Sequence, residues 1–223
     1  MHRQFEEELE DIKHGILSMA GLVEKCLDDM TVALADQNID LAEAVIAADE
    51  EIDQYEVAID RLATQFIARH QPTATDLRFV IVAIKLGPEL ERIADNAVNI
   101  AERILHMSKY PQLKPVVDLP RMLGLAHAMV SDSIAAYVAR DAKSAREVIL
   151  RDDEVDSLYF QIFRVLLTYM IEDPKTISRA IDLILVARFI ERIADQATNI
   201  AEEVVYLVEA KPIRHVYLPE EER

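Results

Sequence analysis

The sequence predicts an all-α protein built from two similar antiparallel three-helix bundles, with six long helices in total. Three observations support this fold class. The chain has only 4 Gly, 8 Pro and no Trp, and 51% of its 223 residues are hydrophobic, which is ample for a core. Apolar residues recur at three- and four-residue steps over long stretches, as in amphipathic helices. The two halves of the chain also repeat each other.

The repeat is clearest in one twelve-residue run. Residues 91–102 read ERIADNAVNIAE, and residues 191–202 read ERIADQATNIAE, with two substitutions. Residues 19–53 also align without a gap on residues 122–156, at an offset of 103 rather than 100. The difference in length is therefore expected in the connection near Gln71. Each half is one repeating unit of about a hundred residues.

The first repeat, residues 1–109, is predicted to contain three helices. An apolar stripe covers residues 3–36, and a second runs from Asn38, a suitable N-cap, to Arg69. The third helix should follow the turn at Gln71-Pro72-Thr73, where Thr73 and Asp76 have the spacing of a capping box, and run to about Lys109. Such short turns make neighbouring helices antiparallel.

The second repeat, residues 120–210, follows a linker at residues 110–119, a proline-containing segment without helical periodicity. Its three helices are expected at residues 120–140, 142–171 and 174–209. No fold is predicted for the tail, residues 211–223. The halves differ at one point inside the third helix, where Gly87-Pro88 aligns with Ala187-Arg188. The proline removes one backbone hydrogen bond and is expected to kink the first of these helices.

Charge and composition exclude several classes of function. A formal net charge of −17 disfavours nucleic acid and anionic membranes as main partners and predicts poor capture of free phosphate. We expect a cytoplasmic protein, because no apolar stretch has the length of a membrane span and the acidic beginning of the chain lacks signal-peptide features. Cys26 is the single cysteine, so a metal site within one chain would need carboxylates.

Acidic residues form stripes beside the core face of two helices in each half. At 100° per residue, the stripe on the third helix spans a wedge of about 80°. Its members in the first half are Glu91, Asp95, Asn99 and Glu102, and a similar stripe on the second helix comprises Asp49, Asp53, Glu56 and Asp60. Carboxylate and amide oxygens are the ligands preferred by hard cations. One multi-carboxylate metal site per half is one reading; a solvated helix flank neutralised by Arg92 and Arg192 is the other.

Other catalytic or metal motifs are missing from the sequence. None of the six histidines stands three residues after a glutamate, as a ferritin-like di-iron site requires. The chain also has no glycine-rich phosphate loop and no nucleophile elbow. We therefore expect no enzyme, and no catalytic residues beyond the acids themselves.

The duplicated E-R-I-A-D-x-A-x-N-I-A-E helices and the D-x-x-x-D helices before them resemble the PhoU family of phosphate-transport accessory regulators. The resemblance covers nearly the whole chain. It implies a pseudo-twofold relation between the bundles, a homodimer, and multinuclear clusters of iron, zinc, manganese or magnesium in some members. The implied metal ligands are Asp49, Asp53, Glu91, Asp95 and Asn99 in the first half, and Asp152, Asp156, Glu191, Asp195 and Asn199 in the second.

Two positions depart from the family pattern. Ala94 stands where the family commonly has glycine, and Gln196 stands where it often has histidine. Ala94 narrows the gap to a neighbouring helix, and Gln196 removes an imidazole ligand. The carboxylate pattern itself is intact, so the departures bear on which metals bind and how many.

The resemblance implies a cytoplasmic adaptor that restrains phosphate uptake and phosphate-starvation signalling. Its implied partners are the ATPase subunit of a phosphate ABC transporter and a phosphate-sensing histidine kinase. Two alternatives stay open from the residues alone. One is a carboxylate-metal enzyme that hydrolyses phosphate compounds, with Glu91 or Glu191 as ligand or base; the other is a metal-free helical scaffold.

Overall fold

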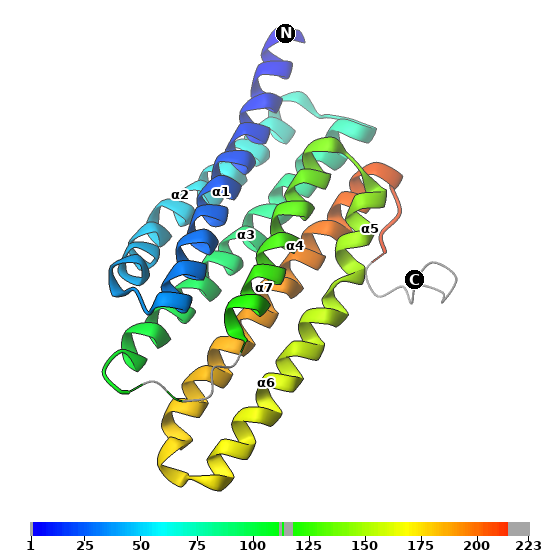
Figure 1. Cartoon of the computed structure of the whole chain (residues 1–223). Helices are drawn as coiled ribbons and strands as arrows, with labels where there is room; N and C mark the ends of the chain where they lie inside the picture. The colour runs from blue at the N-terminus through cyan, green and yellow to red at the C-terminus, as the bar shows by residue number, and fades with distance from the viewer. Residues whose placement is uncertain (1, 112, 114–117, 214–223) are drawn as a thin grey trace.

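The computed structural model describes residues 2–111, 113 and 118–213, and these residues form an elongated assembly of long helices (Figure 1). No strand occurs in the described part of the chain, which confirms the predicted fold class. The helices are α1 (His2–Asp36), α2 (Ile39–His70), α3 (Ala74–Met107), α4 (Leu119–Ala139), α5 (Ala142–Leu150), α6 (Asp152–Glu172) and α7 (Ile177–Glu209), with a 3-10 turn, η1 (Pro174–Thr176), before α7.

The first bundle consists of α1, α2 and α3, and the second consists of α4, α5 with α6, and α7. Helices α3 and α7 pack against each other and join the bundles, while α1 and α4 make a smaller contact (Figure 1). A single hydrophobic core runs through both bundles. The repeat motifs at residues 91–102 and 191–202 therefore lie on the two helices at the centre of the molecule.

Helix caps explain two of the short turns. The side chain of Asn38 accepts a hydrogen bond from the Leu41 amide at 3.2 Å, and Asp141 accepts bonds from the Lys143 and Ser144 amides. The capping box expected at Thr73 is wrong, because the Thr73 side chain makes no cap bond. Ala74 has a φ of 47°, so the chain enters α3 through a left-handed residue instead.

The second helix of the second bundle is interrupted, whereas a continuous helix over residues 142–171 was expected. Helix α5 ends at Leu150, and the Arg151 amide donates to the Val148 oxygen at 3.0 Å, a tighter turn than the α-helix makes. Helix α6 then begins with Asp152, Asp153 and Glu154. Three acids in a first turn suit the positive end of the helix dipole, which favours a new helix start at this point.

The repeat is visible in the pattern of burial. Ile52, Ile59 and Ala63 are buried in α2, and Val155, Ile162 and Leu166 are buried at the same offset of 103 in α6. The offset becomes 100 at the start of the following helices, because residues 71–73 have no counterpart between α6 and η1. This is the place that the sequence predicted for the difference in length.

A layer of polar side chains crosses the interface between α3 and α7. The Lys85 ammonium lies 3.0 Å from a carboxylate oxygen of Glu203 and over the Tyr206 ring. Farther along, the Asn199 amide donates to Glu89 at 3.1 Å. The layer ends where Asp182 pairs with His106 and Arg103, at 2.9 and 3.5 Å. These pairings show that α3 and α7 run antiparallel, and they fix the register of the two helices. In this register the small buried residues Ala94 and Ala194 lie opposite each other.

Replacing Lys85 tests this layer. Lys85→Met keeps the apolar stem but removes the cation beside Glu203, whose side chain is only 3% exposed. We expect a loss of about 1–3 kcal/mol of unfolding free energy, measured by urea denaturation. Lys13→Met is the control, because Lys13 pairs with Glu10 on the surface and should contribute less than about 0.5 kcal/mol. Equal losses in both variants would contradict the role given to the layer.

One helix in the described part of the chain, α4, is long and apolar enough to cross a membrane by length and composition alone. Its packing explains the composition: α4 contacts α1, α5, α6 and α7. Met122, Leu123 and Met129 are buried on it. We therefore interpret α4 as a core helix of the second bundle.

Candidate functional site

The acidic stripes of α2 and α3 meet in the first bundle. Burial, and then repulsion from Asp53 and Asp95, raise the pKa of Asp49. Burial also raises the pKa of Glu91 to about 7, with further increases from the nearby Asp95, Glu56 and Asp53, partly offset by Arg92. Helices α2 and α3 pack against each other, and the acids that raise the pKa of Glu91 come from both of them. The repulsion between these negative carboxylates makes it harder for each of them to lose its proton.

The second bundle repeats this arrangement on α6 and α7. Burial raises the pKa of Asp152 to about 7, and repulsion from Asp195, Asp156 and Glu191 adds to the effect. The pKa values of Glu191 and Asp195 are also raised, chiefly by burial. Eight of the ten predicted ligands, all of them carboxylates, therefore lie on two pairs of packed helices, four on each pair. We call Asp49, Asp53, Glu91 and Asp95 the first cluster, and Asp152, Asp156, Glu191 and Asp195 the second.

Three carboxylate oxygens in these clusters are buried without a hydrogen-bond partner. They are Oδ1 of Asp49 in the first cluster, and Oδ1 of Asp152 and Oε2 of Glu191 in the second. An unpartnered buried acceptor costs free energy, so native proteins seldom contain one without a reason. A cation between the helices would satisfy these oxygens.

The two asparagines make other contacts. The Asn99 amide donates to the backbone oxygen of Asp95 at 2.7 Å. The Asn199 amide donates to Glu89 of the other bundle, as part of the layer between α3 and α7. Glu102, farther along the same stripe, and Asp60 on α2 are partly or fully exposed. In these hydrogen bonds, neither asparagine donates to a carboxylate of α2 or α6.

The two clusters differ at one position, Arg188, whose contact with the site the sequence did not predict. Arg188 pairs with Glu191 through a short contact between guanidinium and carboxylate. The equivalent residue in the first repeat is Pro88, which has no charge. The alignment of Gly87-Pro88 with Ala187-Arg188 contained this signal. From this alignment we predicted a kink in the backbone of the third helix. The structure shows that the same alignment also changes the charge beside the second cluster, because Arg188 pairs with Glu191.

The donor set fits a hard cation. The clusters contain only carboxylate oxygens, three of them buried and unpartnered, and contain no histidine or cysteine. Among the described residues, no three His, Cys, Asp or Glu side chains already converge as they would on a bound metal ion. These side chains would therefore have to rearrange to hold a cation.

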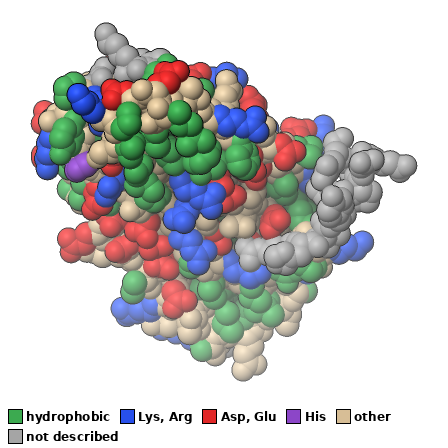
Figure 2. Space-filling model, turned by 90° about the horizontal axis from the view of Figure 1, so that it is seen from below, with side chains coloured by type: hydrophobic (Ala, Val, Ile, Leu, Met, Phe, Trp, Pro, Cys, Tyr) green, Lys and Arg blue, Asp and Glu red, His purple; other side chains and the backbone are tan. Residues whose placement is uncertain are grey.

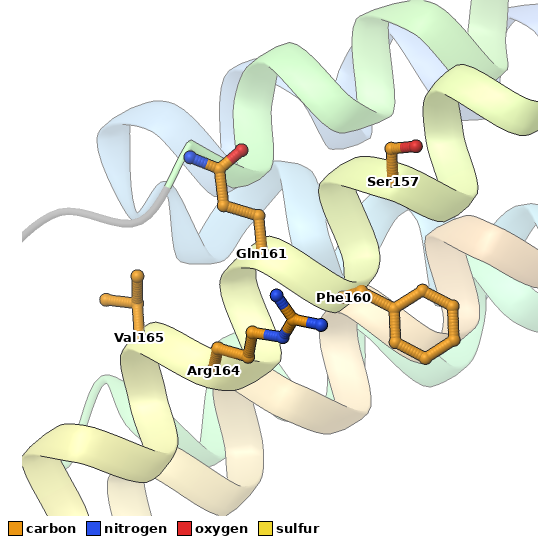
Figure 3. Close-up of a pocket in the computed structure, with 5 residues that line it drawn as sticks. All are labelled: Ser157, Phe160, Gln161, Arg164 and Val165. Atoms are coloured by element: carbon orange, nitrogen blue, oxygen red, sulfur yellow. The ribbon is translucent and has the colours of Figure 1, made fainter.

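A second surface feature lies on the outer side of α6. Its large hydrophobic residues Phe160, Phe163, Leu167 and Ile171 are exposed, Ile171 by 76%, and we call these four residues the apolar band. Beside them is a hollow of about 400 Å³ lined by Ser157, Phe160, Gln161, Arg164 and Val165, all from α6 (Figure 3). Helix α6 lies at the edge of the bundle in Figure 1, and among the described residues no helix buries these four side chains.

The apolar band also lacks acids. Residues 157–171 contain no Asp or Glu, although the chain has 41 of them. The face seen from below in Figure 2 shows patches of hydrophobic side chains beside both acidic and basic ones. Spacings of three and four residues put the band on one side of the helix, which is the pattern that packs against another helix.

Comparison with known proteins identifies the family. Residues 16–104 and 119–204 each match the PhoU domain, one match per bundle. The chain belongs to the PhoU family. It is 44% identical over 214 residues to the phosphate-specific transport system accessory protein PhoU homolog of Aquifex aeolicus, covering 96% of this chain and 97% of that protein. Identity to the Escherichia coli accessory protein PhoU is 38%, over 96% and 88% of the two chains.

Solved structures of the family have the same fold. The crystal structure of PhoU from Pseudomonas aeruginosa matches with a TM-score of 0.90 at 39% identity, covering 93% of this chain and all of that one. The phosphate transport system regulatory protein PhoU from Streptococcus pneumoniae gives a TM-score of 0.85 at 26% identity, covering 96% and 100%. An accessory, regulatory role in phosphate transport is therefore supported for this PhoU-family chain.

The raised pKa values predict how the stability of the metal-free protein depends on pH. Glu91 and Asp152 have pKa values of about 7, raised from 4.5 and 3.8. Between the ordinary and the raised values the folded protein binds more protons than the unfolded chain, so stability falls as pH rises through this window. We expect the melting temperature without metal to be higher at pH 5.5 than at pH 8. Glu91→Gln combined with Asp152→Asn should flatten this dependence, and an equally steep curve in the double variant would contradict the assignment.

Proposed function

We propose that this protein is a cytoplasmic adaptor that restrains phosphate uptake and phosphate-starvation signalling by contact with other proteins. The proposed partners are the ATPase subunit of a phosphate ABC transporter and a phosphate-sensing histidine kinase. Family membership supports the regulatory role, since the relatives are named as transport accessory proteins. The observation that carries the contact mechanism is the apolar band on α6, an exposed helix-sized surface on a strongly acidic chain.

The repeat provides an internal comparison for the band. At the offset of 103, Phe160, Phe163, Leu167 and Ile171 correspond to Val57, Asp60, Thr64 and Ala68 of α2. The same helical scaffold therefore carries Val57 and three small or polar residues on one outer helix, and four large apolar residues on the other. Packing inside the bundle cannot explain this difference, because these four residues of α6 are exposed. A partner that covers the band would explain it.

The chemistry of the band favours a helix of the ATPase subunit with an apolar seam and an acidic residue. Arg164 is the one charged residue in residues 157–171, and it lies in the hollow beside Phe160 (Figure 3). An acid on the partner would pair with it. A second copy of this chain fits less well, because antiparallel pairing of two bands places both Arg164 side chains within about one turn, 5.4 Å, of each other. The homodimer implied by the family resemblance remains a prediction, and we expect it to form through a surface other than the apolar band.

A strain that lacks this protein and carries a phosphate-starvation reporter tests the function. The variant Phe160→Val, Phe163→Asp, Leu167→Thr and Ile171→Ala, which we call the α6 swap, gives α6 the residues of α2. In phosphate-rich medium the wild-type protein should restore repression, whereas the α6 swap should leave the reporter active. Val57→Ser combined with Leu62→Ser, which removes exposed apolar residues from α2, is the control and should repress normally. Full repression by the α6 swap would contradict the assignment of the surface.

The two carboxylate clusters are proposed as metal sites that stabilise the bundles. Asp49, Asp53, Glu91 and Asp95 would hold cations in the first bundle. Asp152, Asp156, Glu191 and Asp195 would do so in the second, and Asn99 and Asn199 would have to change their hydrogen bonds to contribute. Iron, zinc, manganese and magnesium are the metals to test. The bound cation would neutralise the repulsion between helices and so hold α2 on α3 and α6 on α7.

The enzymatic alternative predicts a different result from the same residues. If the clusters hydrolysed phosphate compounds, a metal-loaded preparation would turn over a phosphate ester. Asp95→Ala combined with Asp195→Ala would abolish that turnover. An adaptor would show no turnover, and the double variant would retain the apolar band. We favour the adaptor because the chain has no candidate nucleophile or base outside the acids.

A further inference from the structure

The two carboxylate clusters do not have the same charge environment. In the second cluster, the guanidinium of Arg188 pairs with Oε1 of Glu191 and lies over the Tyr159 ring, 5.9 Å from its centroid. In the first cluster, Pro88 occupies the equivalent position and supplies no cation. Arg92 and Arg192 are equivalent to each other, so they do not create the difference. Arg188 is thus an additional positive charge on one cluster.

Arg188 satisfies only part of the second cluster. Oε1 of Glu191 is occupied by the guanidinium, while Oε2 of the same carboxylate is buried and unpartnered, as is Oδ1 of Asp152. Glu191 is 8% exposed, so its carboxylate is largely withdrawn from solvent. The arginine itself is 43% exposed and can move into solvent without unpacking the core.

We infer that Arg188 is a displaceable counter-cation of the second carboxylate cluster, so that the two halves of the protein bind divalent cations unequally. This rests on the proposed function of the clusters as metal sites. A divalent cation at the second cluster must compete with Arg188 for Glu191 and is repelled by the guanidinium. Among the described residues, no ion pair holds Glu91 of the first cluster, and Arg92 pairs with Glu89 instead. The first bundle is therefore the high-affinity half, and the second fills at higher concentrations of cation.

Titration of the metal-free full-length protein with Mn²⁺, followed by electron paramagnetic resonance, tests the inference. Asp49→Asn with Asp53→Asn leaves the second cluster alone, and Asp152→Asn with Asp156→Asn leaves the first. Adding Arg188→Leu to each background should tighten Mn²⁺ binding at the second cluster by about ten- to a hundredfold, the size of one charge-assisted hydrogen bond. It should leave the first cluster unchanged. Lys143→Leu removes an equal charge from the exposed start of α5, where Lys143 is 86% exposed, and should change neither.

Melting curves separate a counter-cation from a structural ion pair. Without metal, Arg188→Leu should melt below the wild type, and saturating Mn²⁺ should remove that difference. An ion pair that only holds α7 in place would cost the same with and without Mn²⁺, and that result would overturn the inference. Equal effects of Arg188→Leu and Lys143→Leu on Mn²⁺ affinity would also overturn the inference, although the proposed metal sites would stand. Mn²⁺ binding at neither cluster would reject the inference and the proposed metal sites together.

Discussion

Mn²⁺ added to the metal-free protein is expected to raise its melting temperature by on the order of 5–10 °C for each filled cluster. A cation at a hundred times its dissociation constant stabilises the folded state by about 2.7 kcal/mol, and each kcal/mol shifts the melting temperature of a chain of this size by about 2–4 °C. The clusters have the donors for this effect in the buried, unpartnered oxygens of Asp49, Asp152 and Glu191. Calorimetry across an Mn²⁺ series measures it.

Asp95→Ala combined with Asp195→Ala is the matched variant for this experiment. It removes one carboxylate from each cluster and should abolish most of the response to Mn²⁺. Without metal it should melt no lower than the wild type, because the change also relieves like-charge repulsion. Elemental analysis of protein purified without a metal-binding tag should find metal in the wild type and little in the variant. A wild-type melting temperature that Mn²⁺ leaves unchanged would reject metal sites at both clusters.

The largest loss of stability from a single change is expected at Phe66. This side chain is 1% exposed, and its ring lies 4.9 Å from that of Phe5 and 4.8 Å from that of His70. Phe66→Ala would leave a cavity where α1 and α2 pack, so we expect a loss of about 3–5 kcal/mol. Urea denaturation monitored by circular dichroism measures it.

Phe163→Ala is the control for Phe66→Ala, because it makes the same chemical change on the exposed apolar band. With 38% of its surface exposed, Phe163 should contribute less than about 1 kcal/mol. This result would also show that band variants fold, so that a loss of partner binding reports on the surface. If Phe163→Ala destabilised the protein as much as Phe66→Ala, the band would be part of the core.

The helices could be predicted from the sequence because their physical causes are local. Apolar periodicity defines the buried faces, and Asn38 and Asp141 cap helices at the turns expected. The capping box at Thr73 failed because Ala74 adopts a left-handed conformation, which the capping pattern does not encode. The break at Arg151 was missed because the apolar periodicity of α5 and α6 continues across it.

The carboxylate clusters could be predicted because residues four apart share one helix face and antiparallel neighbours bring two such faces together. The ion pair between Arg188 and Glu191 could not be predicted in the same way. Residues three apart on a helix can form such a pair, but the spacing alone does not show that they do. The apolar band was missed for another reason. Helix α6 is apolar on both sides, and periodicity alone cannot tell that Leu158 and Ile162 face the core while Phe160 faces outward.

Direct binding of the purified ATPase subunit of the cognate phosphate transporter tests the central claim most directly. We predict that the wild-type protein binds in calorimetry, and that the α6 swap binds at least tenfold more weakly while melting at a similar temperature. The α2 control, Val57→Ser combined with Leu62→Ser, should bind as the wild type does. Equal affinity of the wild type and the α6 swap would contradict the claim that this PhoU-family protein docks its partner through the outer face of α6.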